Sequence, residues 1–190
     1  LGLPGEDSLR GRGVSYCATC DGGLYRGRAV AVAGGGNSAA EDALTLSKLC
    51  KKVYLIHRRA TLSATRSYLK PLEKAENIEF LWNRQVTGFD VDGTLTGLTL
   101  TDTKTGEESH LPVDGLFVAI GRKPNTWLVK GQLELDRQGY IVADESCRTS
   151  QPGVFAIGDV RTKPLRQVVT AVADGATASK YLEEYLNGLS

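Results

Sequence analysis

Short apolar runs alternate with stretches of helical periodicity in the first half of the chain. Residues 29–33 (AVAVA), 53–56 and 78–82 are apolar runs of strand length. Between them, residues 37–50 and 64–75 repeat apolar side chains at the spacing that is typical of amphipathic helices. This alternation predicts a βαβαβ unit with parallel strands and right-handed crossovers.

The pattern changes after this unit. Residues 86–113 alternate apolar residues with Thr and charged residues, and Asp92-Gly93 and Thr105-Gly106 interrupt them. Such alternation with such breaks predicts hairpins. We therefore expect a small antiparallel meander laid on the parallel sheet, and residues 116–120 (LFVAI) predict a return to that sheet.

The last third of the chain contains too few strands for a sheet of its own. Residues 140–142 and 154–157 predict two short strands, and residues 166–186 predict a long amphipathic helix. We interpret this region as the second half of a domain whose first half is missing. The predicted fold class is α/β, and the expected domains are residues 1–124 and 125–190.

Composition narrows the functional classes. The 190 residues are 41% hydrophobic and 24% charged, with a net charge of +1, which favours neither nucleic acid nor an anionic membrane as a partner. No apolar run approaches the roughly 20 residues that a membrane helix needs. Four Cys are too sparse for a small secreted disulfide framework, so we expect a reducing, cytoplasmic compartment and one working Cys pair.

A Cys-x-x-Cys segment, Cys17 to Cys20, is the first candidate for chemistry. Its two sulfurs can close a disulfide across a turn, and a nearby helix start or cation lowers the pKa of one thiol. Asp21 adds an acid–base group that could shuttle the proton of thiol–disulfide exchange. The alternative is half of a structural zinc site, which needs four ligands. The remaining candidate ligands are isolated: Cys50, Cys147, His57 and His110. We favour the redox pair and expect no metal.

A glycine turn follows the first predicted strand. Gly34, Gly36 and Ala39 form a Gly-x-Gly-x-x-Ala pattern between that strand and a helix. Glycine lets the backbone approach a pyrophosphate, and the helix N-terminus supplies amide donors and a positive dipole end. A plain Gly-rich turn is the alternative, but the position of this one favours a dinucleotide site. The candidate cofactor-binding residues of the helix start are Asn37, Ser38, Ala39 and Glu41.

The end of the second predicted strand bears on which dinucleotide would bind. Enzymes that bind NAD usually have Asp or Glu at this position, whereas this chain has His57, Arg58 and Arg59. Two guanidinium groups can hold a 2′-phosphate with charge-assisted bidentate bonds. The alternative is a solvated surface pair, and His57 is as readily structural as catalytic. The sequence therefore favours NADPH over NADH.

A second candidate cofactor site lies in the last third of the chain. Gly158 and Asp159 close the predicted strand 154–157, and the carboxylate could bind a ribityl hydroxyl. Arg166, Gln167 and Val168 open the long helix, whose N-terminal amides could face a flavin ring carbonyl. Gly-Asp turns and helix starts are common, so these residues alone do not establish a flavin site.

Together these motifs resemble those of the low-molecular-weight, bacterial-type thioredoxin reductases. The matching segments run from the first residue almost to the last: 13–15, 17–21, 34–39, 57–59, 115–121, 152–160 and 166–167. The resemblance implies a Rossmann-like, three-layer NADPH domain that carries the dithiol, followed by the C-terminal part of an FAD domain. It implies an FAD enzyme in which NADPH reduces flavin, flavin reduces the Cys17–Cys20 disulfide, and the dithiol reduces thioredoxin.

The resemblance also implies roles for individual residues. Cys20 would face the flavin, Cys17 would attack the thioredoxin disulfide, and Asp21 would donate the proton. Ile120 and Gly121 would belong to the NADPH site, and the stretch from Asp159 to Val168 would complete the FAD site. A homodimer joined mainly through the FAD domains is implied too, with a rotation of the NADPH domain against them.

Two departures from the family pattern matter. The family often has a third arginine four residues after the pair, where this chain has Ser63, and Arg66 could substitute for it. The resemblance also implies that the first half of the FAD domain, on the order of a hundred residues, is missing from this sequence. We therefore interpret the chain as a fragment that alone should not turn over, and we expect residues 126–190 to expose apolar surface unless another chain covers it.

Other functions remain open. A peroxiredoxin reductase of the same fold favours NADH, and dithiol oxidases and ferredoxin-fed reductases tend to lack a usable nicotinamide site, so the Arg pair and the intact turn argue against them. A non-catalytic NADPH-binding fragment is the alternative from a different class.

Overall fold

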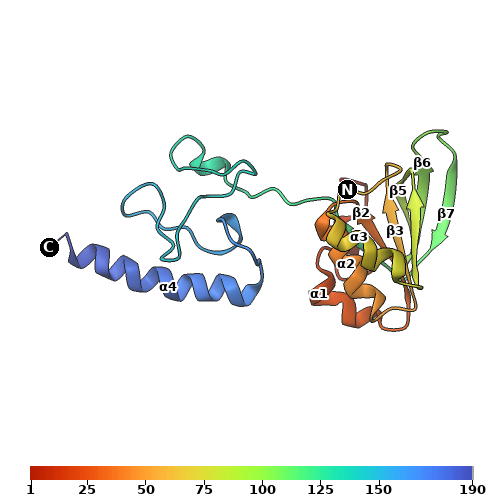
Figure 1. The fold of residues 1–190 in the computed structure, drawn as a ribbon, viewed down its shortest axis with the longest axis horizontal. Coiled ribbons are helices and arrows are strands. Elements are labelled where there is room, and N and C mark those ends of the chain that lie inside the picture. Colours follow the sequence, from red (N-terminus) through yellow and green to blue (C-terminus); the bar gives the residue numbers. More distant parts are fainter. Residues whose placement is uncertain (190) are drawn as a thin grey trace. The chain divides into compact units, whose positions relative to one another are not determined.

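The computed structural model describes residues 1–189 (Figure 1). They form two compact units, Leu1–Gly121 and the residues from Arg122 onward, and each is described by itself.

The first unit is built on a five-stranded parallel sheet. The strand order is β1-β8-β2-β3-β4. The strands are β1 (Val14–Ser15), β8 (Gly115–Ala119), β2 (Ala29–Gly34), β3 (Lys52–His57) and β4 (Ile78–Trp82). Because all five are parallel, their carboxyl ends lie on one edge of the sheet, where ligands of open α/β sheets bind.

Helices cover one face of this sheet (Figure 1). They are α1 (Ala18–Asp21), α2 (Asn37–Ser47) and α3 (Arg66–Lys74), with a 3-10 turn, η2 (Gly22–Tyr25), after α1. Val30 and Val32 of β2 face the helices and share a core with the buried Ala and Leu side chains of α2. Both helices of the predicted βαβαβ unit are confirmed, each slightly shorter than its apolar pattern.

An antiparallel sheet covers the other face. It contains β5 (Arg84–Asp92), β6 (Thr94–Asp102) and β7 (Glu108–Pro112) in sequential order. Its Val and Leu side chains pack against Ala31 and Ala33 of β2, which point away from the helices. The AVAVA run is therefore buried on both faces, as expected for a central parallel strand, and the predicted meander on the sheet is confirmed.

The N-terminal segment is irregular, as the sequence predicts, but it is packed rather than loose. A short 3-10 turn, η1 (Asp7–Leu9), buries Leu9 in the core shared by the two sheets. The Glu6 carboxylate is also buried, and it accepts hydrogen bonds from the Gly2 amide at 2.8 Å and the Tyr16 hydroxyl at 2.7 Å. The segment is thus part of the first unit.

The second unit contains the 3-10 turns η3 (Trp127–Val129) and η4 (Gly158–Val160) and one long helix, α4 (Val168–Asn187). The expected strands 140–142 and 154–157 form only isolated bridges, at Ile141 and Phe155, because this part of the chain supplies no neighbouring strand for them to pair with. The helix starts two residues later than its pattern predicts.

Apolar side chains on α4 are exposed, as expected for this region. They lie along the helix: Val168, Val169, Val172, Leu182 and Leu186. None of the helices within residues 1–189 has the length and apolar character needed to cross a membrane.

Candidate functional site

A cleft of about 760 Å³ lies at the carboxyl ends of β2, β3 and β8. This volume is within the range of cofactor sites. The cleft brings together most of the residues predicted to bind a dinucleotide: Gly34, Gly36, Asn37, Ser38, His57, Arg58, Arg59, Ile120 and Gly121. Segments that are far apart in the sequence thus form one site in the first unit.

The glycine turn allows α2 to start directly against the sheet. A Cβ at Gly34 would overlap the Ala119 carbonyl oxygen and would lie 2.7 Å from the Cβ of Ala39, which is fully buried. Gly36 precedes the helix and provides no side-chain cap for its first turn. The amide groups of that turn are therefore available to an anion, as in other phosphate-binding helix starts.

Two contacts fix the surroundings of the turn. The Asn37 side-chain oxygen accepts a hydrogen bond of 2.8 Å from the Thr65 amide, which ties the start of α2 to the residue before α3. The amide and hydroxyl of Ser63 both donate to the Gly35 carbonyl, at 2.8 and 3.1 Å. Ser63, four residues after the Arg pair, lines the cleft and braces the turn.

His57 packs on the turn, and this contact was not foreseen from the sequence. Its ring occupies the space where a Cβ of Gly35 would lie, and it meets the Trp82 ring edge-on at 6.5 Å. Burial lowers the pKa of His57, and the charges of Arg59 and Arg58 lower it further, although hydrogen bonds with the backbone of Thr61 and Gly34 oppose this. The lowered pKa favours the neutral form of the imidazole, and its contacts favour a structural role.

The Arg pair is exposed where the cleft meets solvent. Arg58 and Arg59 both line the cleft, and neither guanidinium forms an ion pair with any residue from 1 to 189. The Thr103 hydroxyl donates to the Arg58 carbonyl at 3.1 Å and so anchors the backbone beneath the pair. Arg66, the first residue of α3, and Glu41, on the exposed side of α2, do not line the cleft.

The two cysteines of the predicted redox pair are joined. Cys17 and Cys20 form a disulfide with a Cα–Cα distance of 5.3 Å. Cys17 caps the N-terminus of α1, where its sulfur accepts a hydrogen bond of 3.1 Å from the Cys20 amide. The other two cysteines, Cys50 and Cys147, are free and buried.

The acid–base candidate Asp21 is held by a residue that sequence reasoning did not single out as functional. The Ser15 hydroxyl donates to Asp21 Oδ2 at 2.7 Å and accepts from the Cys17 amide at 3.2 Å. Ser15 is the last residue of β1 and is buried. In the sequence, its position two residues before the first cysteine was the signal that could have pointed to this contact.

In the second unit, a smaller cleft of about 370 Å³ lies at the start of α4. Three residues predicted to bind FAD line it: Asp159, Gln167 and Val168. The Gln167 side chain caps α4 in a capping box with Thr170. Arg166 does not line the cleft, because its guanidinium lies 3.8 Å from the centre of the Tyr140 ring.

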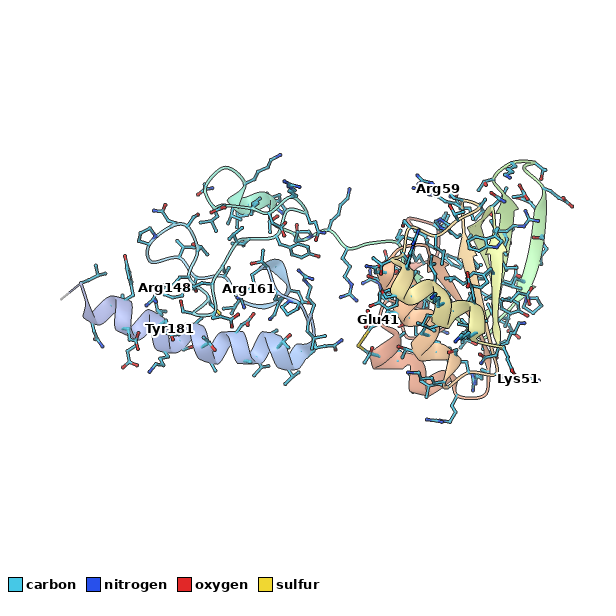
Figure 2. The ribbon with its side chains drawn as sticks, in the orientation of Figure 1. Glu41, Lys51, Arg59, Arg148, Arg161 and Tyr181 are labelled. Atoms are coloured by element: carbon cyan, nitrogen blue, oxygen red, sulfur yellow. A yellow bond between two sulfur atoms is a disulfide. The ribbon has the colours of Figure 1, made fainter. Side chains whose placement is uncertain are left out.

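A buried ionic cluster supports this second cleft. Asp174 of α4 pairs with Arg161 at 3.0 Å and with Lys163 at 2.6 Å, and it also accepts from the Gly158 amide at 2.9 Å. Burial alone would raise the pKa of Asp174, but the Lys163 and Gly158 hydrogen bonds and the Arg161 charge lower it below its ordinary value. The cluster fixes the Gly158-Asp159 turn against the helix. Figure 2 shows Arg161 on the side of the loops that faces α4.

Comparisons with known proteins agree with these features. A family model described as pyridine nucleotide-disulphide oxidoreductase matches residues 1–175. Thioredoxin reductase of Streptomyces clavuligerus is 47% identical over an alignment that covers 100% of this chain and 59% of that protein. Thioredoxin reductase of Listeria monocytogenes is 45% identical, with 100% of this chain and 60% of that protein covered.

A solved structure is similar as well. The crystal structure of thioredoxin reductase from Streptococcus pyogenes matches with a TM-score of 0.92 and 39% identity, covering 99% of this chain and 62% of that one. The chain thus spans about three fifths of the length of the relatives it matches.

Proposed function

The chain belongs to the pyridine nucleotide-disulphide oxidoreductase family, and from this premise we propose that it is a disulfide reductase that uses NADPH and FAD to reduce thioredoxin through the Cys17–Cys20 pair. One observation carries the proposal. The disulfide follows the carboxyl end of β1, and the nucleotide cleft lies at the carboxyl ends of β2, β3 and β8 in the same parallel sheet. We propose thioredoxin as the partner because the relatives are named thioredoxin reductase.

The residues of the first cleft fit NADPH. Gly34 and Gly36 bring the backbone close to where a pyrophosphate would lie, and the uncapped amides of α2 supply donors and a positive dipole end. Arg58 and Arg59 are exposed at the end of β3 without carboxylate partners among residues 1–189, so both are available to a 2′-phosphate. This arrangement supports NADPH rather than NADH.

The residues of the second cleft fit one end of FAD. Asp159 can accept hydrogen bonds from ribityl hydroxyls, and the start of α4 at Val168 can direct amide groups toward a flavin carbonyl. When bound, FAD would supply the two-electron transfer between the nicotinamide and the disulfide. We assign residues 1–124 to NADPH and the dithiol, and residues 125–190 to part of the FAD site.

The dithiol then performs two exchanges. The Cys17 thiolate attacks the thioredoxin disulfide, one thioredoxin sulfur leaves and takes a proton, and a mixed disulfide forms. The Cys20 thiolate attacks Cys17 Sγ, which releases the second thioredoxin sulfur and restores the Cys17–Cys20 disulfide. Asp21, directly after Cys20, would hold and deliver the protons. We propose Cys20 as the sulfur that faces the flavin.

Assembly and compartment follow from the same proposal. Because α4 exposes several apolar side chains, we expect another protein surface to cover them. We propose that this surface belongs to a second copy of the chain, in a homodimer in the cytoplasm. A second candidate is an NADPH-binding protein without turnover. The lining of the second cleft favours it for this chain, because Gly158 and Arg166, which were also expected to bind FAD, do not line it.

The first test is nucleotide binding by the 190-residue chain, measured by calorimetry. Arg58→Ala/Arg59→Ala should weaken NADPH binding by about 10- to 100-fold, because charge-assisted hydrogen bonds to the 2′-phosphate are lost, and it should leave NADH binding unchanged. A double variant of equal charge change, Lys48→Ala/Lys51→Ala, removes two exposed lysines that do not line the cleft and should change neither. Equal losses of affinity for NADPH and NADH would contradict the proposal that Arg58 and Arg59 bind the 2′-phosphate.

A further inference from the structure

We propose that Ser15 is a positioning residue that holds the Asp21 carboxyl in place for proton transfer to the Cys17–Cys20 pair. The inference rests on the proposed function, in which Asp21 is the proton donor. It adds a residue that acts through Asp21 rather than on the sulfurs.

Ser15 is anchored by the sheet. It is the last residue of β1 and pairs in register with Phe117 of β8, which is fully buried. The Ser15 side chain lies at the point where the rigid strand gives way to the turn that carries the disulfide, and the residue is only 5% exposed. Its hydroxyl therefore has a fixed position relative to the sheet.

The hydroxyl joins both ends of α1. It accepts from the Cys17 amide at 3.2 Å, before the helix, and donates to Asp21 Oδ2 at 2.7 Å, at its last residue. A serine hydroxyl has one proton to donate. The Cys17 carbonyl lies 3.5 Å away, at the limit of a hydrogen bond, so the shorter contact to the carboxylate is preferred. The helix adds its own link, because the Asp21 amide donates to the Cys17 carbonyl at 3.1 Å.

This geometry gives the hydroxyl a role in exchange chemistry. When a thiolate attacks one sulfur of the pair, the S–S bond breaks, a mixed disulfide forms, and the displaced sulfur takes a proton. The Asp21 carboxylate can take up the proton that the attacking thiol releases and pass it to the displaced sulfur, and this transfer requires the carboxyl to stay near the turn. The Ser15 hydrogen bond restrains the side chain of Asp21, and without it the carboxyl is free to rotate toward solvent.

The test uses dithiothreitol to reduce the oxidised 190-residue chain, with acid quenching, alkylation and mass measurement to give the rate. A first dithiothreitol thiolate opens the disulfide, and its second thiolate closes the oxidised dithiothreitol ring and frees the second cysteine. Ser15→Ala should slow the reaction about tenfold, as expected for the loss of one hydrogen bond to a charged group. Ser15→Thr, which keeps the hydroxyl on a β-branched side chain suited to a strand, should stay within about twofold of the unsubstituted chain.

A matched control separates this role from a general loss of a hydroxyl. Ser47→Ala removes a partly buried hydroxyl at the end of α2, which donates to the Leu44 carbonyl at 2.9 Å. Dithiothreitol should reduce the disulfide of this variant at the same rate as that of the unsubstituted chain. Far-UV circular dichroism and thermal unfolding confirm that each variant is folded under the assay conditions.

The decisive measurement is a double-mutant cycle with Asp21→Asn. If Ser15 acts through Asp21, Ser15→Ala should change the rate by less than about twofold in the Asp21→Asn background. An equal slowing by Ser15→Ala in both backgrounds would overturn the inference, as would no slowing by Ser15→Ala when Asp21→Asn does slow the reaction. If Asp21→Asn itself has no effect, the proposed proton donor fails, and the positioning role fails with it.

Discussion

Removing the charge of Asp174 should destabilise the second unit and leave the stability of the first unit unchanged. The variant Asp174→Asn keeps the size of the side chain but removes the charge that pairs with Arg161 and Lys163. The side chains of these two cations are 8% and 7% exposed, so neither can be resolvated without movement of the backbone. Breaking a buried ion pair by removing one partner costs about 3–5 kcal/mol. The equilibrium constant for opening of this unit should therefore increase by roughly 100- to 4,000-fold, at 1.4 kcal/mol for each factor of ten.

The two free cysteines provide a separate assay for each unit. Cys147 is fully buried in the second unit, where its sulfur lies 3.7 Å from the Asp174 carbonyl oxygen, and Cys50 is buried in the first. Burial raises the pKa of both thiols, so each reacts with a thiol reagent when its surroundings open. In the Asp174→Asn variant, Cys147 should be labelled faster by roughly the factor above, while Cys50 should be labelled at an unchanged rate.

Glu184→Gln is the matched control. Glu184 is also on α4, but its side chain is 51% exposed, and its two partners, Lys180 at 3.5 Å and Arg148 at 3.9 Å, are exposed as well. Exposed pairs contribute about 0–1 kcal/mol, so Cys147 labelling should change by less than about fivefold. The reasoning is refuted if Asp174→Asn changes Cys147 labelling no more than this control does, or if it accelerates Cys50 equally.

Two further predictions concern the first unit. Gly34→Ala should lower the free energy of unfolding, measured by urea titration, by about 1–3 kcal/mol, because the added Cβ would overlap the Ala119 carbonyl. The same variant should bind NADPH more weakly. Gly23→Ala is the neutral control, because a Cβ at Gly23 would have nothing within 4 Å. Burial would raise the pKa of Glu6, but hydrogen bonds from Tyr16, the N-terminal amine and the amides of Leu3 and Gly2 lower it from 4.5 to about 2. Its contribution to stability is therefore present above pH 4.5 and lost as the pH falls toward 2. Urea titrations over this range should show a smaller loss for Glu6→Gln, and an identical pH profile would contradict the assignment.

The first unit could be predicted because its signals are local. The AVAVA run, the helical spacing that follows it and the Asp92-Gly93 break each specify an element within a few residues. The glycine turn and the Arg pair lie where β2 and β3 end, so the topology alone brings them to one edge of the sheet. Periodicity and the βαβαβ order were sufficient for the layers of the first unit and for the meeting of these residues at one cleft.

The contacts that the sequence did not predict depend on tertiary packing. Asp174 lies within a helical pattern and carries no sign that Arg161 and Lys163 will meet it. His57 fills the space above Gly35 only because the turn after β2 lies beside the end of β3. The two short strands expected in the second unit were wrong for a related reason, since a strand exists only where a neighbour can pair with it.

The position of β1 has a consequence for the order in which the molecule folds. This two-residue strand lies at the edge of the sheet, and its one strand partner among residues 1–189 is β8, which comes from the opposite end of the first unit's sequence. Non-local pairings of this kind pay their loop-closure entropy before they gain contacts, and they form late. During synthesis, Cys17 and Cys20 leave the ribosome long before the strand that fixes their turn exists. The disulfide segment should therefore be the last part of this unit to acquire its native structure, and until then the sheet does not hold Cys17 and Cys20 at their native separation.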